Sequence, residues 1–340
     1  MIFFLCLRRN AVPIVQYLRT IWPDKFGARI EPVCYEDLAR LKIRRGLYVF
    51  SDIELLDDVR RAEAVALHAR LSAEPERYRV WNDPARSARR FDVLDAMARE
   101  GINRFRAFRA DEALPADVRY PVFVRDEHEH KGALTPLLAD EAAVRAAIAE
   151  LRAGSRPTGP LLVVEYLEYG SADGIYRKYS VFRLGDRLLA KHVLFSPDWL
   201  LRTPDVKRFA GPKWLEEEWR FLRDDAAHEA LRGVFERLHI DYGRIDYTLV
   251  DGRVQVFEIN SNPMLLKPSQ FRPDGPRLEI HRWFADRFAE MMTAADPVRR
   301  VPFLRRIWWR LHKPKSDPTP WWRRLLPGWK PAGRIAQKPA

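Results

Sequence analysis

The feature that most constrains the fold of this chain is a predicted β-hairpin over residues 243–263. Two runs rich in β-branched and aromatic residues flank Asp251-Gly252, a pair typical of a tight turn with positive φ. Asp246 lies on the first strand. Glu258 and Asn260 lie on the second strand, two residues apart, so their side chains leave the same face. We therefore expect a compact cluster of oxygen ligands on one face of the hairpin.

This cluster suits Mg²⁺, which proteins usually hold through one or two carboxylates together with substrate phosphates. A solvated hairpin face is the alternative, because carboxylates on hairpins usually meet water. Glu258 and Asn260, however, stand in the apolar run Val256-Phe-Glu-Ile-Asn260, where an unpaired charge is costly. The residue pattern therefore favours metal binding.

Hydrophobic periodicity predicts the remaining elements. In residues 1–110, short apolar runs alternate with helical patterns, which is typical of an α/β domain with a largely parallel sheet. The expected strands there are 2–6, 30–34, 47–50, 78–81 and 104–108, and the expected helices are 53–71 and 87–100. Further along the chain, we expect strands at 120–125, 161–167, 178–182 and 187–194, and helices at 140–152, 224–238 and 277–292.

The charge distribution separates a body from a tail. The formal net charge is +12, but residues 299–340 contain twelve Lys and Arg against one acidic residue, so the remainder of the chain is nearly neutral. The last forty residues also hold five of the eleven Trp and seven Pro. We therefore treat residues 299–340 as a basic Trp/Pro-rich tail rather than a continuation of the fold.

Several classes of protein are disfavoured by what the sequence lacks. Cys6 and Cys34 lie in apolar runs and offer no disulfide framework, which fits a reducing cytosol. The short apolar start has its charges behind it, unlike a signal peptide, and no apolar run is long enough to span a membrane. No Gly-x-Ser-x-Gly, Walker-type, His-Glu-x-x-His or Cys-x-x-Cys pattern occurs. We expect a cytoplasmic protein that is neither a nucleophile-based hydrolase nor a P-loop enzyme.

The hairpin resembles the metal-binding core of the ATP-grasp superfamily. Its spacing, Asp246-x11-Glu258-x-Asn260 followed by Ser-Asn-Pro, is close to that of the ribosomal-protein glutamate ligase and glutathione synthetase-like branch. The resemblance implies an α/β protein with an α+β ATP-grasp body. Its expected parts are an N-terminal pre-ATP-grasp domain (1–85), a linker helix with the small subdomain (86–168), the large subdomain with the metal hairpin (169–298) and the tail (299–340).

The resemblance also implies a nucleotide site. Residues 163–170 resemble the hinge that holds adenine, although an ordinary strand and turn would have the same pattern. Arg125 stands where the family has a phosphate-binding Lys, and a solvated charged loop is the alternative for residues 126–131. The family's usual phosphate-binding Arg aligns with Ser180, so Lys178 is its expected substitute. The expected nucleotide contacts are Arg125, Lys131, Gly132, Glu165, Tyr166, Leu167, Asp173, Lys178 and Lys191.

The implied reaction is an ATP-dependent ligation of a carboxylate to an amine, or less often a thiol, through an acyl phosphate. Asp246, Glu258 and Asn260 would hold one or two Mg²⁺ ions, with Mn²⁺ as an expected substitute. Lys178 and Arg244 are the candidate catalytic cations. The expected substrates are a small-molecule or peptide carboxylate and an amine. Two alternatives stand beside this: a non-catalytic nucleotide-binding protein of ATP-grasp type, and a membrane-associated scaffold that acts through its tail.

The tail has three candidate roles. Its Arg clusters alternate with Trp, as in Arg305-Arg306-Ile-Trp308-Trp309-Arg310. Trp favours the membrane–water interface and basic residues favour anionic lipid, so we expect peripheral contact with an anionic inner-membrane surface. Packing of the tail onto the body is nearly equally favoured. Nucleic-acid binding comes third, because the body is nearly neutral.

Overall fold

The computed structural model describes residues 1–20, 28–86, 88–128, 132–154, 159–201, 208–224, 228–271 and 275–298. These residues belong to two compact units. Among the described residues, unit 1 contains those of 1–85 and 261–298, and unit 2 contains those of 86–260. Residues 261–298, which the sequence interpretation assigned to the hairpin domain, thus group with the N-terminal residues. The tail expectations fall on residues 299–340, which lie outside the described residues.

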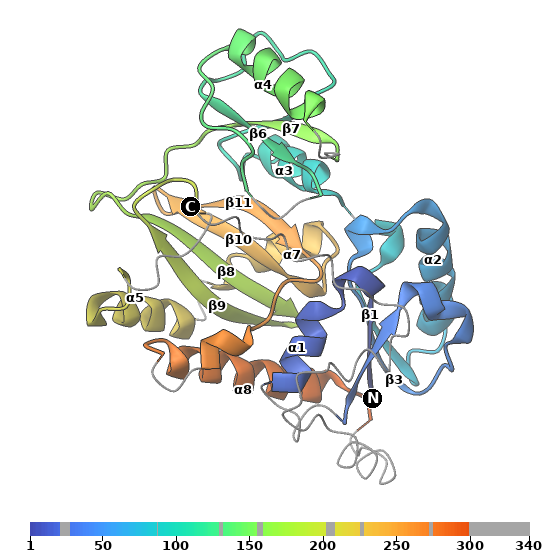
Figure 1. The fold of residues 1–340 in the computed structure, drawn as a ribbon. Helices are drawn as coiled ribbons and strands as arrows, with labels where there is room; N and C mark the ends of the chain where they lie inside the picture. Colours follow the sequence, from blue (N-terminus) through green and yellow to red (C-terminus); the bar gives the residue numbers. More distant parts are fainter. Residues whose placement is uncertain are drawn as a thin grey trace, which may run out of the picture. The chain divides into compact units, whose positions relative to one another are not determined.

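Unit 1 is built on a parallel sheet, as the alternating pattern predicts. Its strand order is β2-β1-β3-β4, and Figure 1 labels the two central strands, β1 and β3. The strands are β1 (Ile2–Cys6), β2 (Ile30–Cys34), β3 (Gly46–Phe50) and β4 (Tyr78–Trp81), with β1 and β3 buried along their whole length. Continuous apolar runs of this kind are typical of parallel strands that are covered on both faces.

The helices of unit 1 come from both ends of its sequence. They are α1 (Val12–Thr20), α2 (Asp58–Ser72) and α8 (Leu278–Ala295). The hydroxyl of Tyr17 in α1 donates to the carbonyl of Ala285 in α8 at 2.9 Å. Phe288, also in α8, packs edge-on against the Tyr17 ring. Short 3₁₀ turns complete the unit at Arg8–Asn10, Tyr35–Arg40, Ile53–Leu55 and Pro268–Phe271.

Unit 2 contains a three-stranded antiparallel sheet with a helix on each face. Its order is β5-β7-β6, and its members are β5 (Ala107–Arg109), β6 (Val122–Asp126), β7 (Leu161–Glu165), α3 (Arg90–Arg99) and α4 (Glu141–Ala153). Alternate residues of β7 face opposite sides: Leu161 and Val163 pack with Ile148 of α4, whereas Leu162 and Val164 pack with Leu94 of α3. The strand expected at 104–108 therefore forms at 107–109, and it belongs to this sheet rather than to the parallel one.

A four-stranded antiparallel sheet carries the hairpin, with the order β11-β10-β8-β9 (Figure 1). Its strands are β8 (Tyr176–Leu184), β9 (Arg187–Ser196), β10 (Tyr242–Val250) and β11 (Arg253–Asn260), and helices α5 (Pro212–Arg223) and α7 (Arg232–Arg237) accompany it. The hairpin turn has positive φ at Asp251 (50°) and Gly252 (72°), as expected. Within the described residues, the helix expected at 224–238 is divided: residues 228–229 are helical, and α7 covers 232–237.

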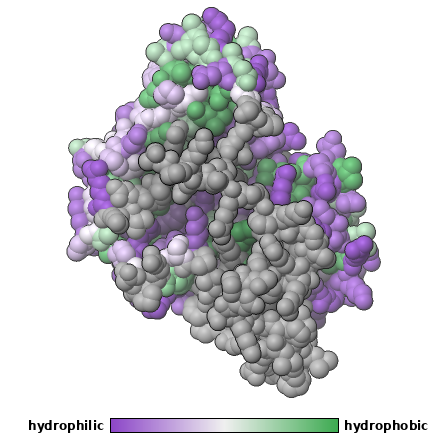
Figure 2. All heavy atoms as spheres, in the orientation of Figure 1, coloured by the Kyte–Doolittle hydropathy of each residue, from purple (hydrophilic) through white to green (hydrophobic). Residues whose placement is uncertain are grey.

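No helix in the described parts of the chain is long and apolar enough to cross a membrane. Figure 2 shows hydrophilic residues interspersed with weakly apolar ones over the end of unit 2 that carries α4. The exposed residues of α4 include Glu141, Ala142, Arg145, Ala146 and Glu150. This helix therefore presents an ordinary solvated face outside the sheet that it covers.

Candidate active site

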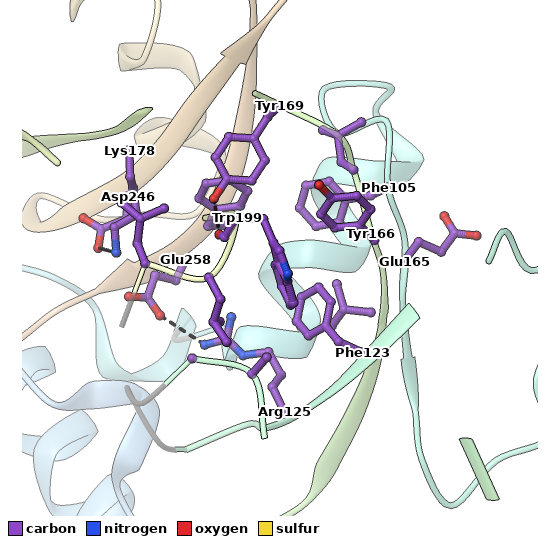
Figure 3. Close-up of a pocket in the computed structure, with 17 residues that line it drawn as sticks. Phe105, Phe123, Arg125, Glu165, Tyr166, Tyr169, Lys178, Trp199, Asp246 and Glu258 are labelled. Carbon is purple, nitrogen blue, oxygen red and sulfur yellow. Dashed lines mark hydrogen bonds and ion pairs between the residues drawn. The ribbon is translucent and has the colours of Figure 1, made fainter. Parts of the chain in front are cut away.

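The candidate site is a cavity of about 170 Å³ in unit 2 that both antiparallel sheets line (Figure 3). One part of its wall is aromatic and the other is charged. The aromatic residues are Phe105, Phe123, Tyr166, Tyr169, Trp199 and Phe257. The charged lining residues include Arg125, Lys178, Asp246 and Glu258. An apolar wall beside a few converging charges is the usual character of a small-molecule site.

The aromatic wall is a set of rings in mutual contact. The ring centroid of Trp199 lies 5.3 Å from that of Phe123 and 5.4 Å from that of Tyr166, the latter in an edge-to-face arrangement. The Tyr169 hydroxyl donates to the Trp199 carbonyl at 2.6 Å, which fixes the loop that follows β9. These contacts hold several ring faces around one space, and a flat heterocycle would find stacking partners there.

A β-bulge places two consecutive residues of β11 in the cavity wall. The pairing of β10 with β11 shifts between Asp246 and Tyr247, so that Asp246 pairs with Glu258 and Tyr247 pairs with Val256. Phe257 is the extra residue. Neighbouring side chains of a regular strand leave opposite faces, yet Phe257 and Glu258 both line the cavity. The bulge thus joins the aromatic wall to the charged wall.

Asp246 is buried at the charged end of the cavity, with 2% of its surface exposed. Its Oδ1 accepts a 2.7 Å hydrogen bond from the Ser180 hydroxyl and lies 2.8 Å from Nε of Arg244. Its Oδ2 accepts from Nη2 of Arg244 at 3.0 Å and lies 3.7 Å from Nζ of Lys178. Two cations and a hydroxyl therefore compensate this buried carboxylate, as a buried charge requires.

Glu258 faces Asp246 directly across the hairpin. Its Oε2 accepts from Nη2 of Arg90 at 2.6 Å and from Nη2 of Arg125 at 3.4 Å. Burial, reinforced by the neighbouring Arg90 charge, lowers the pKa of Arg125 to about 10. Nε of Arg125 is buried with no hydrogen-bond partner among the described residues. Arg125 is therefore a buried cation whose bonding capacity is only partly used.

The three expected metal ligands lie on adjacent positions of the hairpin. Asp246 pairs with Glu258, and Asn260 pairs with Arg244 two residues away. Within the described part of the chain, no group of three or more His, Cys, Asp or Glu is arranged to hold a metal ion. Two carboxylates and one amide form a different kind of donor set, namely hard oxygen ligands that leave positions for substrate phosphates. This donor set fits Mg²⁺.

The hinge residues reach the cavity in different ways. Glu165 lines it, but its carboxylate points away from the cavity and is bound by Arg106 and Arg119 at distances of 2.6–3.0 Å (Figure 3). Tyr166 contributes its ring, while its backbone N–H donates to the Pro121 carbonyl at 2.9 Å. In the described chain, we find no hydrogen-bond partner for either backbone group of Leu167. Among the described residues, the Leu167 backbone groups are therefore left for a ligand, whereas the Glu165 carboxylate is already bound.

Other expected nucleotide contacts lie away from the cavity wall. Asp173 is paired with Arg177 at 2.8 Å, and this guanidinium lowers the pKa of Asp173 to about 2. Lys191 is buried with its ammonium 5.9 Å from the centre of the Phe182 ring. Gly132 does line the cavity, with a φ of 82°. Lys131 lies outside the described residues.

Sequence reasoning missed Arg90 and Trp199. Arg90 begins α3, and besides its bond to Glu258 it donates to the backbone carbonyls of Asp126 and Glu127 at 3.2 and 2.5 Å. Nothing in the run Arg89-Arg90-Phe91 marks one of these residues as buried. Trp199 stands in a loop, where no periodicity predicts its direction. The pairing of Arg90 with Glu258 arises only when α3 packs beside β11.

Cations outnumber carboxylates around the paired Asp246 and Glu258. Two carboxylates, Asp246 and Glu258, are shared by four cations, namely Arg90, Arg125, Lys178 and Arg244. Such an excess of positive charge in a partly enclosed cavity attracts an anionic ligand. The aromatic wall next to it suits a ligand that carries a flat ring and an anionic group.

Comparisons with solved structures give matches over most of the chain. The D-alanine–D-alanine ligase from Bacillus anthracis, in its complex with ATP, matches with a TM-score of 0.46 and 12% identity, covering 85% of this chain and 99% of that one. The D-alanine–D-alanine ligase from Coxiella burnetii matches with a TM-score of 0.44 and 13% identity, covering 86% and 97%. A RimK domain ATP-grasp protein from Sphaerobacter thermophilus DSM 20745 matches with a TM-score of 0.40 and 17% identity, covering 84% and 98%.

No family model matches the sequence, and no curated protein matches it. Structural likeness at these identities and TM-scores carries no residue role, so the function is inferred from the site itself.

Proposed function

We propose that this chain is an ATP-dependent ligase of ATP-grasp type, which joins a carboxylate to an amine through an acyl phosphate. The observation that carries the proposal is a single cavity with an aromatic wall at one part and paired carboxylates amid four cations at the other. A nucleoside triphosphate combines the two features that this cavity accommodates, a flat base and a polyanion.

In this proposal, the base lies among the aromatic rings and bonds the Leu167 backbone at the hinge. The triphosphate then extends toward Arg125 and Lys178, both of which line the cavity. A guanidinium can hold a phosphate bidentately, so Arg125 is a chemically suitable replacement for a Lys. Its Nε has no hydrogen-bond partner among the described residues, which leaves it capacity for an additional anionic ligand.

Asp246, Glu258 and Asn260 would hold Mg²⁺, with Mn²⁺ as an expected substitute. The ion supplies charge neutralisation at the phosphate oxygens when it is bound. The protein's own contribution is to hold both carboxylates directly opposite each other and to keep Arg90, Arg125, Lys178 and Arg244 beside them. These cations would stabilise the charge that develops on the transferred phosphoryl group.

The proposed chemistry needs no protein nucleophile. A carboxylate is a poor electrophile because oxide would have to leave. Transfer of the γ-phosphoryl group to the substrate carboxylate gives an acyl phosphate and ADP. The amine then attacks the acyl carbon, and phosphate leaves. Positioning and charge compensation are the main demands of phosphoryl transfer, and a cavity rich in cations meets them.

The test is a screen of amino acids and small carboxylates for ADP release, with Asp246→Ala as the blank. We expect ADP release that depends on both a carboxylate and an amine, and that is lost in the variant. Mg-ATP binding measured by titration calorimetry, without ADP release for any pair, would instead support a non-catalytic nucleotide-binding protein. Absence of Mg-ATP binding would contradict both interpretations.

A further inference from the structure

One row of polar side chains crosses the whole four-stranded sheet. His192 on β9 pairs with Ser180 on β8, Ser180 pairs with Asp246 on β10, and Asp246 pairs with Glu258 on β11. Residues directly opposite each other on neighbouring strands place their side chains on the same face. His192, on the edge strand, is therefore connected in register to the carboxylates that line the cavity.

Two short contacts make the first three residues of this row a continuous chain. Nε2 of His192 lies 3.0 Å from Oγ of Ser180, and the Ser180 hydroxyl donates to Oδ1 of Asp246 at 2.7 Å. A Ser hydroxyl has a single proton. Because the Ser180 hydroxyl uses this proton in its hydrogen bond to Asp246, the imidazole must be the donor in the contact between His192 and Ser180. The geometry therefore assigns a proton to Nε2 of His192.

Because they are buried, the hydrogen bonds from His192 through Ser180 matter for the Asp246 carboxylate. Ser180 has no exposed surface, and Asp246 has 2%. Water is thus a poor substitute for the hydroxyl; without it Asp246 keeps Arg244 and Lys178 but loses the hydrogen bond at Oδ1 that the hydroxyl donates. Hydrogen bonds in such a chain polarise one another. The imidazole N–H strengthens the Ser180 hydroxyl as a donor, and the hydroxyl, together with the Arg244 guanidinium, fixes the rotation of the Asp246 carboxylate.

We propose that His192 is a positioning residue, which acts through Ser180 to hold the Asp246 carboxylate in the orientation that a divalent cation and its nucleotide require. The inference rests on the proposed function, because it treats Asp246 as a metal ligand. Residues that orient a ligand in this way change metal affinity by about 10–100-fold when they are replaced. His192 itself is absent from the cavity wall.

The first experiment determines the proton position. In protein labelled with ¹⁵N-histidine, long-range ¹H–¹⁵N correlation identifies which imidazole nitrogen carries hydrogen, and the His192 signals are assigned by their loss in His192→Gln. We expect hydrogen on Nε2, and a change of these signals in Ser180→Ala. A neutral His192 with its hydrogen on Nδ1 would contradict the proposed hydrogen bonds from His192 through Ser180 to Asp246, whether or not the protein binds nucleotide.

The second experiment measures the effect on metal-dependent binding. Titration calorimetry gives the Kd of ADP with Mg²⁺ and with EDTA, and the ratio of the two is the Mg²⁺ enhancement. We expect His192→Ala and Ser180→Ala each to lower this enhancement by about 10-fold while the Kd in EDTA changes little. The double variant should lower the Mg²⁺ enhancement no further than either single variant, because both substitutions interrupt the same series of hydrogen bonds.

His192→Gln is the conservative control, because its amide retains an N–H at a similar reach, and it should restore most of the enhancement. A merely structural role would weaken binding equally with and without Mg²⁺. An unchanged enhancement in His192→Ala would overturn the positioning role and leave the proposed function standing. No Mg²⁺ enhancement in the wild-type protein would overturn the proposed function and the positioning role together.

Discussion

Glu258 is the residue at which the charged network converges, because it is bound by Arg90 and Arg125 and faces Asp246. We expect Glu258→Gln to lower ATP turnover by at least about 100-fold, since loss of a direct metal ligand should exceed the 10–100-fold effect of an outer-shell partner. Glu217→Gln is the matched control, since Glu217 is also paired with an Arg in unit 2 but is absent from the cavity wall. Coupled ADP-release kinetics, with circular dichroism to monitor folding, would check this. Wild-type turnover in Glu258→Gln would contradict the assignment.

Arg125 tests the anionic part of the site. Removal of a hydrogen bond to a charged group costs about 1.5–3 kcal/mol, so we expect Arg125→Ala to raise the KM for ATP by about 10–100-fold. Glu258 retains Arg90 in this variant, and the fold should therefore persist. Arg125→Lys should recover part of the affinity, and the exposed Arg145→Ala should have no effect. An unchanged KM in Arg125→Ala would show that the phosphates lie elsewhere.

Single residues were predictable where chemistry and spacing coincide. The positions of Asp246, Glu258 and Asn260 on one hairpin follow from strand alternation and from the Asp251-Gly252 turn. Directions of side chains that depend on tertiary packing were not predictable. Glu165 is an example, because its carboxylate is drawn away from the cavity by Arg106 and Arg119, residues more than forty positions distant in sequence.

At the scale of elements, two of the predicted helices, α2 and α4, begin directly after a capping Asp. The helix expected at 140–152 forms as Glu141–Ala153, with Oδ1 of Asp140 accepting from the Ala143 N–H at 2.8 Å. The strands of unit 1 follow their apolar runs closely. Bulges were not predictable, since no local signal places the extra residue at Lys191 in β9 or at Phe257 in β11. The β11 bulge lies in the wall of the candidate site, a common place for a bulge.

Capping of α4 gives a prediction for stability. Replacement of a good N-cap residue by Ala usually costs about 1 kcal/mol, so Asp140→Ala should lower the unfolding free energy by about that amount. Glu150→Ala, on the exposed part of the same helix, should change it by less than about 0.5 kcal/mol. Urea denaturation followed by circular dichroism measures both. Equal losses in the two variants would indicate that the cap contributes nothing specific.

At the scale of the whole molecule, the tail carries nearly all of the net charge. Each Lys or Arg near an anionic lipid surface is worth about 1 kcal/mol, so we expect the full chain to co-sediment with anionic vesicles at low salt and to be released by high salt. Deletion of residues 299–340 should abolish co-sedimentation without lowering ATP turnover. Zwitterionic vesicles are the control. Undiminished vesicle binding after the deletion, or loss of folding, would contradict a membrane role.

The division of unit 1 between two separated parts of the chain has a consequence for biosynthesis. Its sheet is complete at Trp81, but α8, which bonds and packs against Tyr17, begins at Leu278. Translation at about 5–20 residues per second separates the two by about 10–40 s. Throughout that interval α1 lacks the helix that Tyr17 contacts, while the whole of unit 2 emerges. The ribosome therefore completes unit 2, which holds the candidate active site, before it completes unit 1, whose synthesis began first.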